Sequence, residues 1–220
     1  MKRFAIASFA AVLLAPAIAA AQPGSYAPPP PPPPGGYYAG SPATLPGGFH
    51  DRMGRLALGF SIGLGAMNTS TGAIGCSGCD YNPAAFEVDF HIGGMISPRL
   101  ALMLEVQGNG QTVQSVDGGA GTVTLVQGTA MAAAQYWLTP KLWLKGGIGA
   151  AHLSYDYNDA YGTQSEPLDN GAALMGAIGY EVYSTREFSV DLQGRFIEGS
   201  YKGIDDQISS GSVGVGFNWY

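Results

Sequence analysis

Cys76 and Cys79 are the only cysteines in a chain of 220 residues. The Cys-x-x-Cys spacing occurs both in metal sites and in redox motifs. Two thiolates alone make a poor zinc site, and a redox motif needs a helix N-terminus to favour the thiolate. No helix is expected around these cysteines, and the N-terminus described below marks the chain for export. The sequence therefore predicts a local disulfide between Cys76 and Cys79 that pins a loop.

His152 and Ser154 are the one pair that could act as a base and a nucleophile, with Glu166 further along the chain. A carboxylate that orients a histidine beside a serine is the arrangement of a catalytic triad. The pair resembles the His-x-Ser of outer-membrane lipid A deacylases. However, Ser154 is followed by Tyr155, Asp156 and Tyr157, where that family has small and amide residues. We therefore interpret His152 and Ser154 as interfacial residues on the apolar face at a strand end, and we expect no enzyme.

The elements that carry these residues are strands, because apolar residues alternate with polar or small ones along most of the chain after residue 50. One such run has Phe86, Val88, Phe90 and Ile92 on one face, and Glu87, Asp89, His91 and Gly93 on the other. The alternation predicts strands at about 54–66, 85–96, 99–111, 122–138, 141–155, 171–184, 187–200 and 209–220.

The connections between these strands alternate in length. Short turns at 97–99, 139–141 and 184–187 alternate with long loops at about 67–84, 112–121, 156–170 and 201–208. Short turns at one end and long loops at the other are typical of a transmembrane barrel. The predicted fold class is all-β, an eight-stranded antiparallel up-and-down transmembrane β-barrel. A lipocalin-like soluble barrel, with its apolar face inside, is the alternative.

Composition favours the membrane barrel. Only 12% of the residues are charged, against about 25% in ordinary soluble domains, and 34 residues are glycine. The polar face of the strands is mostly small, which suits a narrow lumen where a few opposite charges can pair. The predicted lumen charge cluster comprises Arg55, Glu87, Asp89, Glu105, Lys145, Glu181, Asp191 and Arg195.

Several further side chains have expected places in this barrel. His91 is expected to pack or hydrogen-bond in the lumen rather than to bind a metal, and we expect no cofactor. Trp137, Trp143 and Trp219 lie near strand ends on the short-turn side. Amphipathic aromatic rings favour membrane interfaces, so these tryptophans are expected in an aromatic belt.

The N-terminal part of the chain differs in composition from the rest. Lys2 and Arg3 precede an apolar run that ends in Ala19–Ala21, which is the pattern of a cleaved signal peptide. A proline run at 28–34 follows and cannot build a core. The expected organisation is a signal peptide at 1–21, a disordered Pro/Gly-rich segment at 22–49 and a barrel at 50–220.

The last strand carries a pattern of polar-x-Gly-x-x-hydrophobic-x-aromatic residues, filled by Ser212, Gly214, Phe217 and Trp219. This resembles the C-terminal assembly signal of outer-membrane proteins, and residues of about 50–220 resemble the small barrels of the OmpA, OmpX and OmpW type. The resemblance implies recognition by the barrel-assembly machinery. It also implies residence in the outer membrane of a Gram-negative bacterium, among its lipid and lipopolysaccharide. We expect no peptidoglycan-binding domain after the barrel.

These features lead to one expected function and two alternatives. We expect a monomeric, non-enzymatic barrel with a structural or surface-interaction role in the cell envelope. A narrow porin-like channel for small solutes and a lipid A-modifying hydrolase are the alternatives. A formal net charge of −6 disfavours nucleic acid as a partner. The long loops are acidic, which suits a hydrophilic exterior, divalent-cation bridges to lipopolysaccharide or a basic partner.

Overall fold

The computed structural model describes Leu45 and residues 47–116, 121–159, 162–203 and 207–220. The expected signal peptide and most of the Pro/Gly-rich segment lie outside the described residues. Among the described residues, no helix is long and apolar enough to cross a membrane. The strands are β1 (Leu56–Thr69), β2 (Gly72–Ala73), β3 (Ala85–Ser97), β4 (Leu100–Val116), β5 (Gly121–Trp137), β6 (Leu142–Asp159), β7 (Gly162–Ser184), β8 (Phe188–Tyr201) and β9 (Gln207–Trp219).

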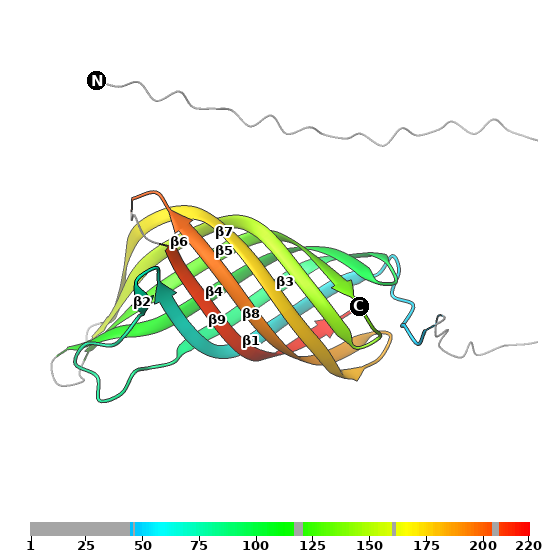
Figure 1. Ribbon diagram of the computed structural model, residues 1–220, viewed down its shortest axis with the longest axis horizontal. Helices are drawn as coiled ribbons and strands as arrows, with labels where there is room; N and C mark the ends of the chain where they lie inside the picture. The colour runs from blue at the N-terminus through cyan, green and yellow to red at the C-terminus, as the bar shows by residue number, and fades with distance from the viewer. Residues whose placement is uncertain (1–44, 46, 117–120, 160–161, 204–206) are drawn as a thin grey trace, which may run out of the picture. The chain divides into compact units, whose positions relative to one another are not determined.

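The long strands form one closed antiparallel sheet, shown in Figure 1. Each strand from β3 to β9 pairs with its neighbour in the sequence, and β1 pairs with both β3 and β9. The β1–β9 pairing runs from Leu58 opposite Trp219 to Thr69 opposite Ile208, which closes the barrel. The predicted eight-stranded antiparallel up-and-down barrel is therefore confirmed. The two-residue β2 is an addition that pairs with the end of β1.

The apolar face of the strands points outward. Along β5, buried residues alternate with half-buried or exposed ones over the whole strand. Leu104, Ile148 and Val213 are 66%, 66% and 71% exposed, and they belong to a band of large apolar side chains around the wall. Such a band is unfavourable in water at roughly 25 cal/mol per Å² of apolar surface. The soluble-barrel alternative, with its apolar face inside, is thus wrong.

At the long-loop end, strands extend into the loops that the sequence predicted. β4 continues to Val116, within the loop expected at 112–121. The loop expected at 156–170 is largely an extension of β6 and β7, which stay paired as far as Asp159 and Gly162. Thr, Tyr and Asn side chains in this stretch lack a strict apolar alternation because both faces of the hairpin are exposed. The extension of β6 and β7 depends on backbone pairing alone, so side-chain periodicity in the sequence does not reveal it.

Two of the three tryptophans are also placed differently. Trp137 and Trp143 are opposite each other in the β5–β6 ladder and are 2% and 1% exposed, inside the barrel. Only Trp219 faces outward, at 44% exposure. The interfacial prediction for Trp137 and Trp143 was wrong because it used their distance from the strand end and ignored the face on which they lie.

Candidate functional site

Arg195 on β8 is the centre of the charged lumen. Its Nε lies 3.3 Å from Glu87 Oε1, and its Nη1 lies 3.3 Å from Asp89 Oδ2. Nη1 also bonds Glu105 and donates to Gln107 Oε1 at 3.0 Å. One guanidinium therefore joins carboxylates from β3 and β4 across the lumen. A planar group with five donors is suited to this role.

A second cation completes the central network. Lys145 Nζ on β6 lies 3.0 Å from Glu105 Oε2, so Glu105 bonds Lys145 and Arg195 with its two oxygens. Ser61 donates to Asp89 Oδ1 at 2.7 Å, and Ser212 donates to Glu87. Buried charges are costly unless they are paired and hydrogen-bonded. This network meets that condition for the acids on β3 and β4.

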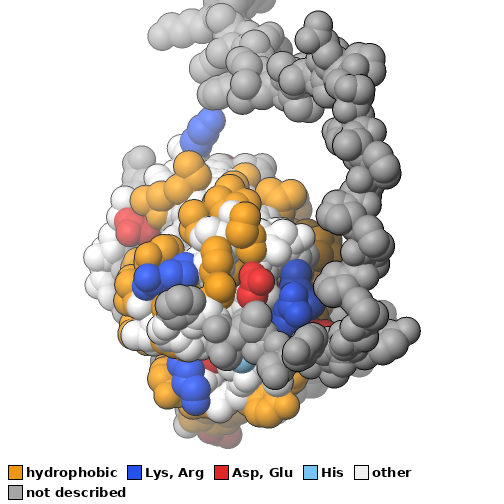
Figure 2. All heavy atoms as spheres, turned by 90° about the vertical axis from the view of Figure 1, so that its right-hand side faces the viewer, with side chains coloured by type: hydrophobic (Ala, Val, Ile, Leu, Met, Phe, Trp, Pro, Cys, Tyr) orange, Lys and Arg blue, Asp and Glu red, His pale blue; other side chains and the backbone are white. Residues whose placement is uncertain are grey.

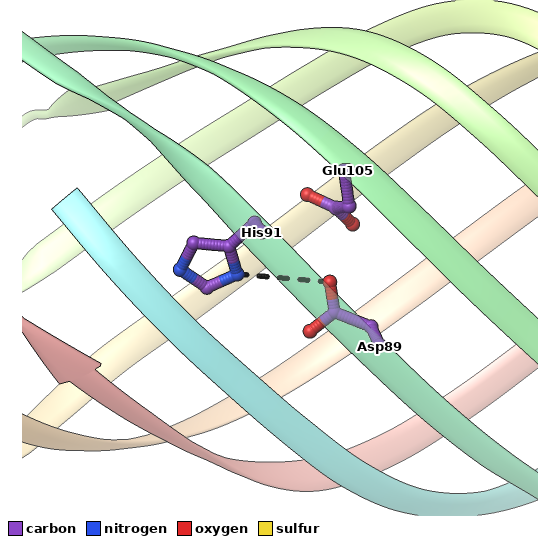
Figure 3. Close-up of side chains that lie close together, drawn as sticks. All are labelled: Asp89, His91 and Glu105. Carbon is purple, nitrogen blue, oxygen red and sulfur yellow. Dashed lines mark ion pairs between the residues drawn. The ribbon is translucent and has the colours of Figure 1, made fainter.

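Asp89, His91 and Glu105 are close enough to suggest a metal centre. Figure 3 shows the three side chains inside the barrel, and their ligand-type atoms lie within 4.8 Å of one another. His91 Nδ1 is 3.7 Å from Asp89 Oδ2. However, Arg195 Nη1 contacts both Asp89 and Glu105, so a guanidinium already occupies the space between the carboxylates. The arrangement thus suits an ion-pair network better than a divalent cation.

Glu181 and Asp191 lie nearer the short-turn end. Asp191 accepts a hydrogen bond from Asn218 Nδ2 at 2.7 Å. Glu181 accepts one from Trp137 Nε1 at 2.8 Å and another from Ser184. Its cation partner is Arg52, whose Nη1 lies 3.0 Å from Glu181 Oε1. The floor of the lumen thus holds two buried carboxylates, of which Glu181 pairs with Arg52.

The lumen prediction needs one correction at this end. The structure buries the predicted lumen charges inside the barrel except Arg55, which contacts Tyr220 O and the exposed Glu187 at the barrel mouth. Arg52, which sequence analysis missed, enters the lumen instead. Both arginines precede β1, where no strand periodicity indicates which side chain turns inward. The only sequence signal for Arg52 was that an arginine lies close to the first strand of a barrel with a polar lumen.

The His-x-Ser pair is not assembled. A bulge between Leu153 and Ser154 shifts the β6–β7 register, and both of these residues are buried. His152 lies on the outer face, where its Nδ1 is 2.9 Å from Asn170 Oδ1. Glu166 is opposite Tyr155 rather than His152. His152 and Ser154 lie opposite Gly128 and Val126 in the regular β5–β6 ladder, so they share the outward parity as expected, although Ser154 itself is buried.

The loop after β1 contains the disulfide. Cys76 and Cys79 are joined, with their Cα atoms 5.6 Å apart. Between them, the Ser77 N–H donates to Val113 O, and the Ser77 carbonyl accepts from the Ser115 N–H, both at 2.9 Å. The short disulfide loop therefore lies against the end of β4.

The residues of the predicted assembly signal lie along the β1–β9 seam. Phe217 stacks on Phe60 with ring centroids 5.0 Å apart, and Trp219 packs on Phe188 at 5.1 Å. Gly214 lies opposite Gly63, and Ser212 lies opposite Gly65. These residues thus contribute to closing the barrel, besides the recognition predicted for them.

Comparison with known proteins supports the fold. No family model and no curated protein matches the chain. Among solved structures, Ail, the attachment invasion locus protein of Yersinia pestis, is similar at 13% identity, over 76% of this chain and 99% of that chain, with a TM-score of 0.50. Neisserial surface protein A is 12% identical over 73% of this chain and 95% of its own, with a TM-score of 0.49. The likeness to Ail shows that this chain has the fold of the small outer-membrane β-barrels, as the resemblance in its sequence predicted.

Proposed function

We propose that this protein is a non-enzymatic integral barrel of the Gram-negative outer membrane, with a structural or surface-interaction role in the envelope. The observation that carries the proposal is a filled lumen inside an apolar wall. Arg195 and Lys145 bridge the acids at its centre. Towards the long-loop end, Gln127 Nε2 donates to the Tyr201 hydroxyl at 2.9 Å, and Ser210 donates to Gln127. Bonded side chains thus cross the lumen at several levels, which favours a closed barrel over a pore.

The proposed orientation places the short turns in the periplasm and the long loops outside the cell. Around the short-turn end, exposed rings of Tyr136, Tyr180, Tyr183 and Trp219 form an outward group that suits a membrane interface. The wall between the two ends would contact outer-membrane lipid and lipopolysaccharide. The protein would be a monomer. Recognition of β9 by the barrel-assembly machinery belongs to the same proposal.

The long-loop end would be the interaction surface. Its described acidic residues are Asp80, Asp156, Asp159, Glu166 and Asp169, and its one described cation is Lys202. Ail has been solved in complex with a heparin analogue, sucrose octasulfate. The long-loop end of the present chain is acidic, so it suits a positively charged ligand instead. We propose a basic partner, or lipopolysaccharide phosphates bridged by divalent cations, at these loops.

Electrical recording tests the filled lumen. The refolded protein in a planar lipid bilayer is expected to give no stable single-channel current, because Arg195, Lys145 and the central acids occupy the cross-section. The matched control is an open porin reconstituted in the same lipid. Stable, sizeable currents from the wild-type protein would contradict the proposal and favour the narrow-channel alternative.

A further inference from the structure

Residues 47–55 form an ordered segment at the short-turn end, and we call it the lid. The Gly54 N–H donates to Met95 O at 2.8 Å, and the Met95 N–H donates to Arg55 O at 2.9 Å. Gly47, Gly48 and Gly54 have φ values of 88°, 80° and 75°, which is backbone that favours glycine and turns the chain sharply. These bonds join the lid to the end of β3.

Two turns of the barrel mouth also hold the lid. Arg186 Nε, on the β7–β8 turn, donates to Asp51 O at 3.1 Å. The guanidinium of Arg99, on the β3–β4 turn, lies 4.5 Å from the centre of the Phe49 ring. Figure 2 looks onto this end and shows Lys and Arg side chains distributed around it. The lid thus contacts turns on two sides of the mouth.

Arg52 connects the lid to the inside of the lumen. Its side chain is 4% exposed, and the side chain of Glu181 is fully buried. Nη1 and Nη2 donate to the two Glu181 oxygens at 3.0 and 3.3 Å. Nη2 also donates to Ser184 Oγ at 3.0 Å and to Thr185 O at 2.7 Å.

Aromatic rings complete this socket. The Arg52 guanidinium carbon is 3.8 Å from the centre of the Tyr220 ring and 5.9 Å from that of Trp137. These contacts match a flat guanidinium: the Glu181 carboxylate accepts two hydrogen bonds, Ser184 and Thr185 supply further acceptors, and the Tyr220 ring stacks on its face. An ammonium group has neither the fork nor the flat face, so lysine cannot make the same set of contacts.

We propose that the floor of the lumen is a guanidinium-binding site whose ligand is the chain's own Arg52, and that this contact latches residues 47–55 across the short-turn mouth as a lid. The site goes beyond the proposed envelope role and does not depend on it. Trp137 donates to the same Glu181 carboxylate as Arg52. Release of the latch therefore uncovers Glu181 and Trp137 and gives solvent access to an acidic lumen from this end.

His50, whose carbonyl accepts a hydrogen bond from the Arg52 N–H at 3.0 Å, is expected to make the latch sensitive to acid. Burial and then the positive charge of Arg52 lower the pKa of His50 from its usual 6.5, opposed by Glu181 and a backbone hydrogen bond at Ser184. The closed lid therefore favours neutral His50. The resulting contribution to the stability of the closed lid is fully present at neutral pH and is lost as the pH falls below about 6.5. Lid amide exchange, corrected for intrinsic rates, is expected to rise between about pH 7.5 and about pH 5.5. His50→Gln should reduce that rise, and an equal rise in both proteins would contradict the assignment.

Hydrogen exchange of the refolded full-length protein in detergent, read by mass spectrometry, tests the latch. In Arg52→Ala, exchange of the Gly54 and Arg55 amides is expected to increase at least about tenfold, because the lid opens more often. Arg52→Lys should also lose protection. Amides in the middle of β5 serve as the internal control and should not change. Acrylamide quenching of tryptophan fluorescence should increase in parallel as Trp137 becomes accessible.

Three outcomes would overturn the proposal. Unchanged lid protection in Arg52→Ala would show that Arg52 is not the latch. Full protection in Arg52→Lys would show that the site is not specific for guanidinium. If Arg52→Ala does not fold, the pair Tyr220→Phe and Tyr220→Ala decides. The first keeps the ring beneath Arg52 and should keep protection, whereas the second should lose it, and equal protection in both would also overturn the proposal.

Discussion

Replacing Arg195 with alanine is expected to cost about 3–5 kcal/mol of unfolding free energy, which is the usual effect of removing one partner from a buried ion pair. Arg195 is 5% exposed and contacts Glu87, Asp89 and Glu105. Its loss leaves three buried carboxylates with Lys145 as the remaining nearby cation. Urea unfolding in detergent micelles, followed by loss of the heat-modifiable gel band, measures the effect.

A second substitution distinguishes lost charge pairing from lost packing. Glu87 ion-pairs with Arg195 and accepts a hydrogen bond from Ser212. Glu87→Gln in the Arg195→Ala background should therefore recover about 1 kcal/mol or more, because it removes an uncompensated charge. Arg195→Lys should fall between the wild type and Arg195→Ala. If Arg195→Ala unfolds within about 1 kcal/mol of the wild type, the central role of Arg195 is refuted.

Gly179→Ala is expected to destabilise the barrel by about 1–3 kcal/mol through overpacking. A Cβ on Gly179 would lie 2.2 Å from Trp143 Cζ2 and 2.4 Å from Cε2. The Trp143 ring is 1% exposed and lies over Lys145 Nζ at 5.5 Å, so its displacement would disturb the charge network as well. The same urea titration measures the loss, and near-ultraviolet circular dichroism should report the moved ring.

Gly176 on the same strand is the matched control. A Cβ there meets nothing within 4 Å, because Gly176 faces outward from the barrel. Gly176→Ala is expected to change stability by less than about 1 kcal/mol, and in the stabilising direction if the conformational entropy of glycine dominates. Equal losses at Gly176 and Gly179 would mean that the strand, and not the contact with Trp143, is sensitive.

The strand pattern was the most informative part of the sequence. Phe86 to Gly93 alternate strictly, and β3 contains them with Glu87, Asp89 and His91 buried and the phenylalanines exposed. Period-two alternation reports the face of each residue directly, provided that the register stays regular. The low charge content then indicated that the apolar face lies outside.

The departures occur where that regularity ends. The β6–β7 register shift between Leu153 and Ser154 places Glu166 opposite Tyr155 and not opposite His152. Trp137 and Trp143 are a separate case, because the alternation of β5 and β6 is regular there and already places both rings inside. Bulges and ladder register depend on the partner strand, so the residues of one strand do not reveal them. The extension of β6 and β7 up to Asp159 and Gly162 has the same origin, since backbone pairing continues without an apolar face.

The sequence by itself determined the barrel, its outward apolar face and the set of acids in its lumen, because each depends on local alternation and composition. Only the tertiary structure decided which cations meet those acids. Arg195 reaches carboxylates on two other strands, and Arg52 rather than Arg55 enters the floor to meet Glu181. Partners 129 positions apart in the sequence, such as Arg52 and Glu181, meet only when closure of the β1–β9 seam fixes the path of the chain before β1.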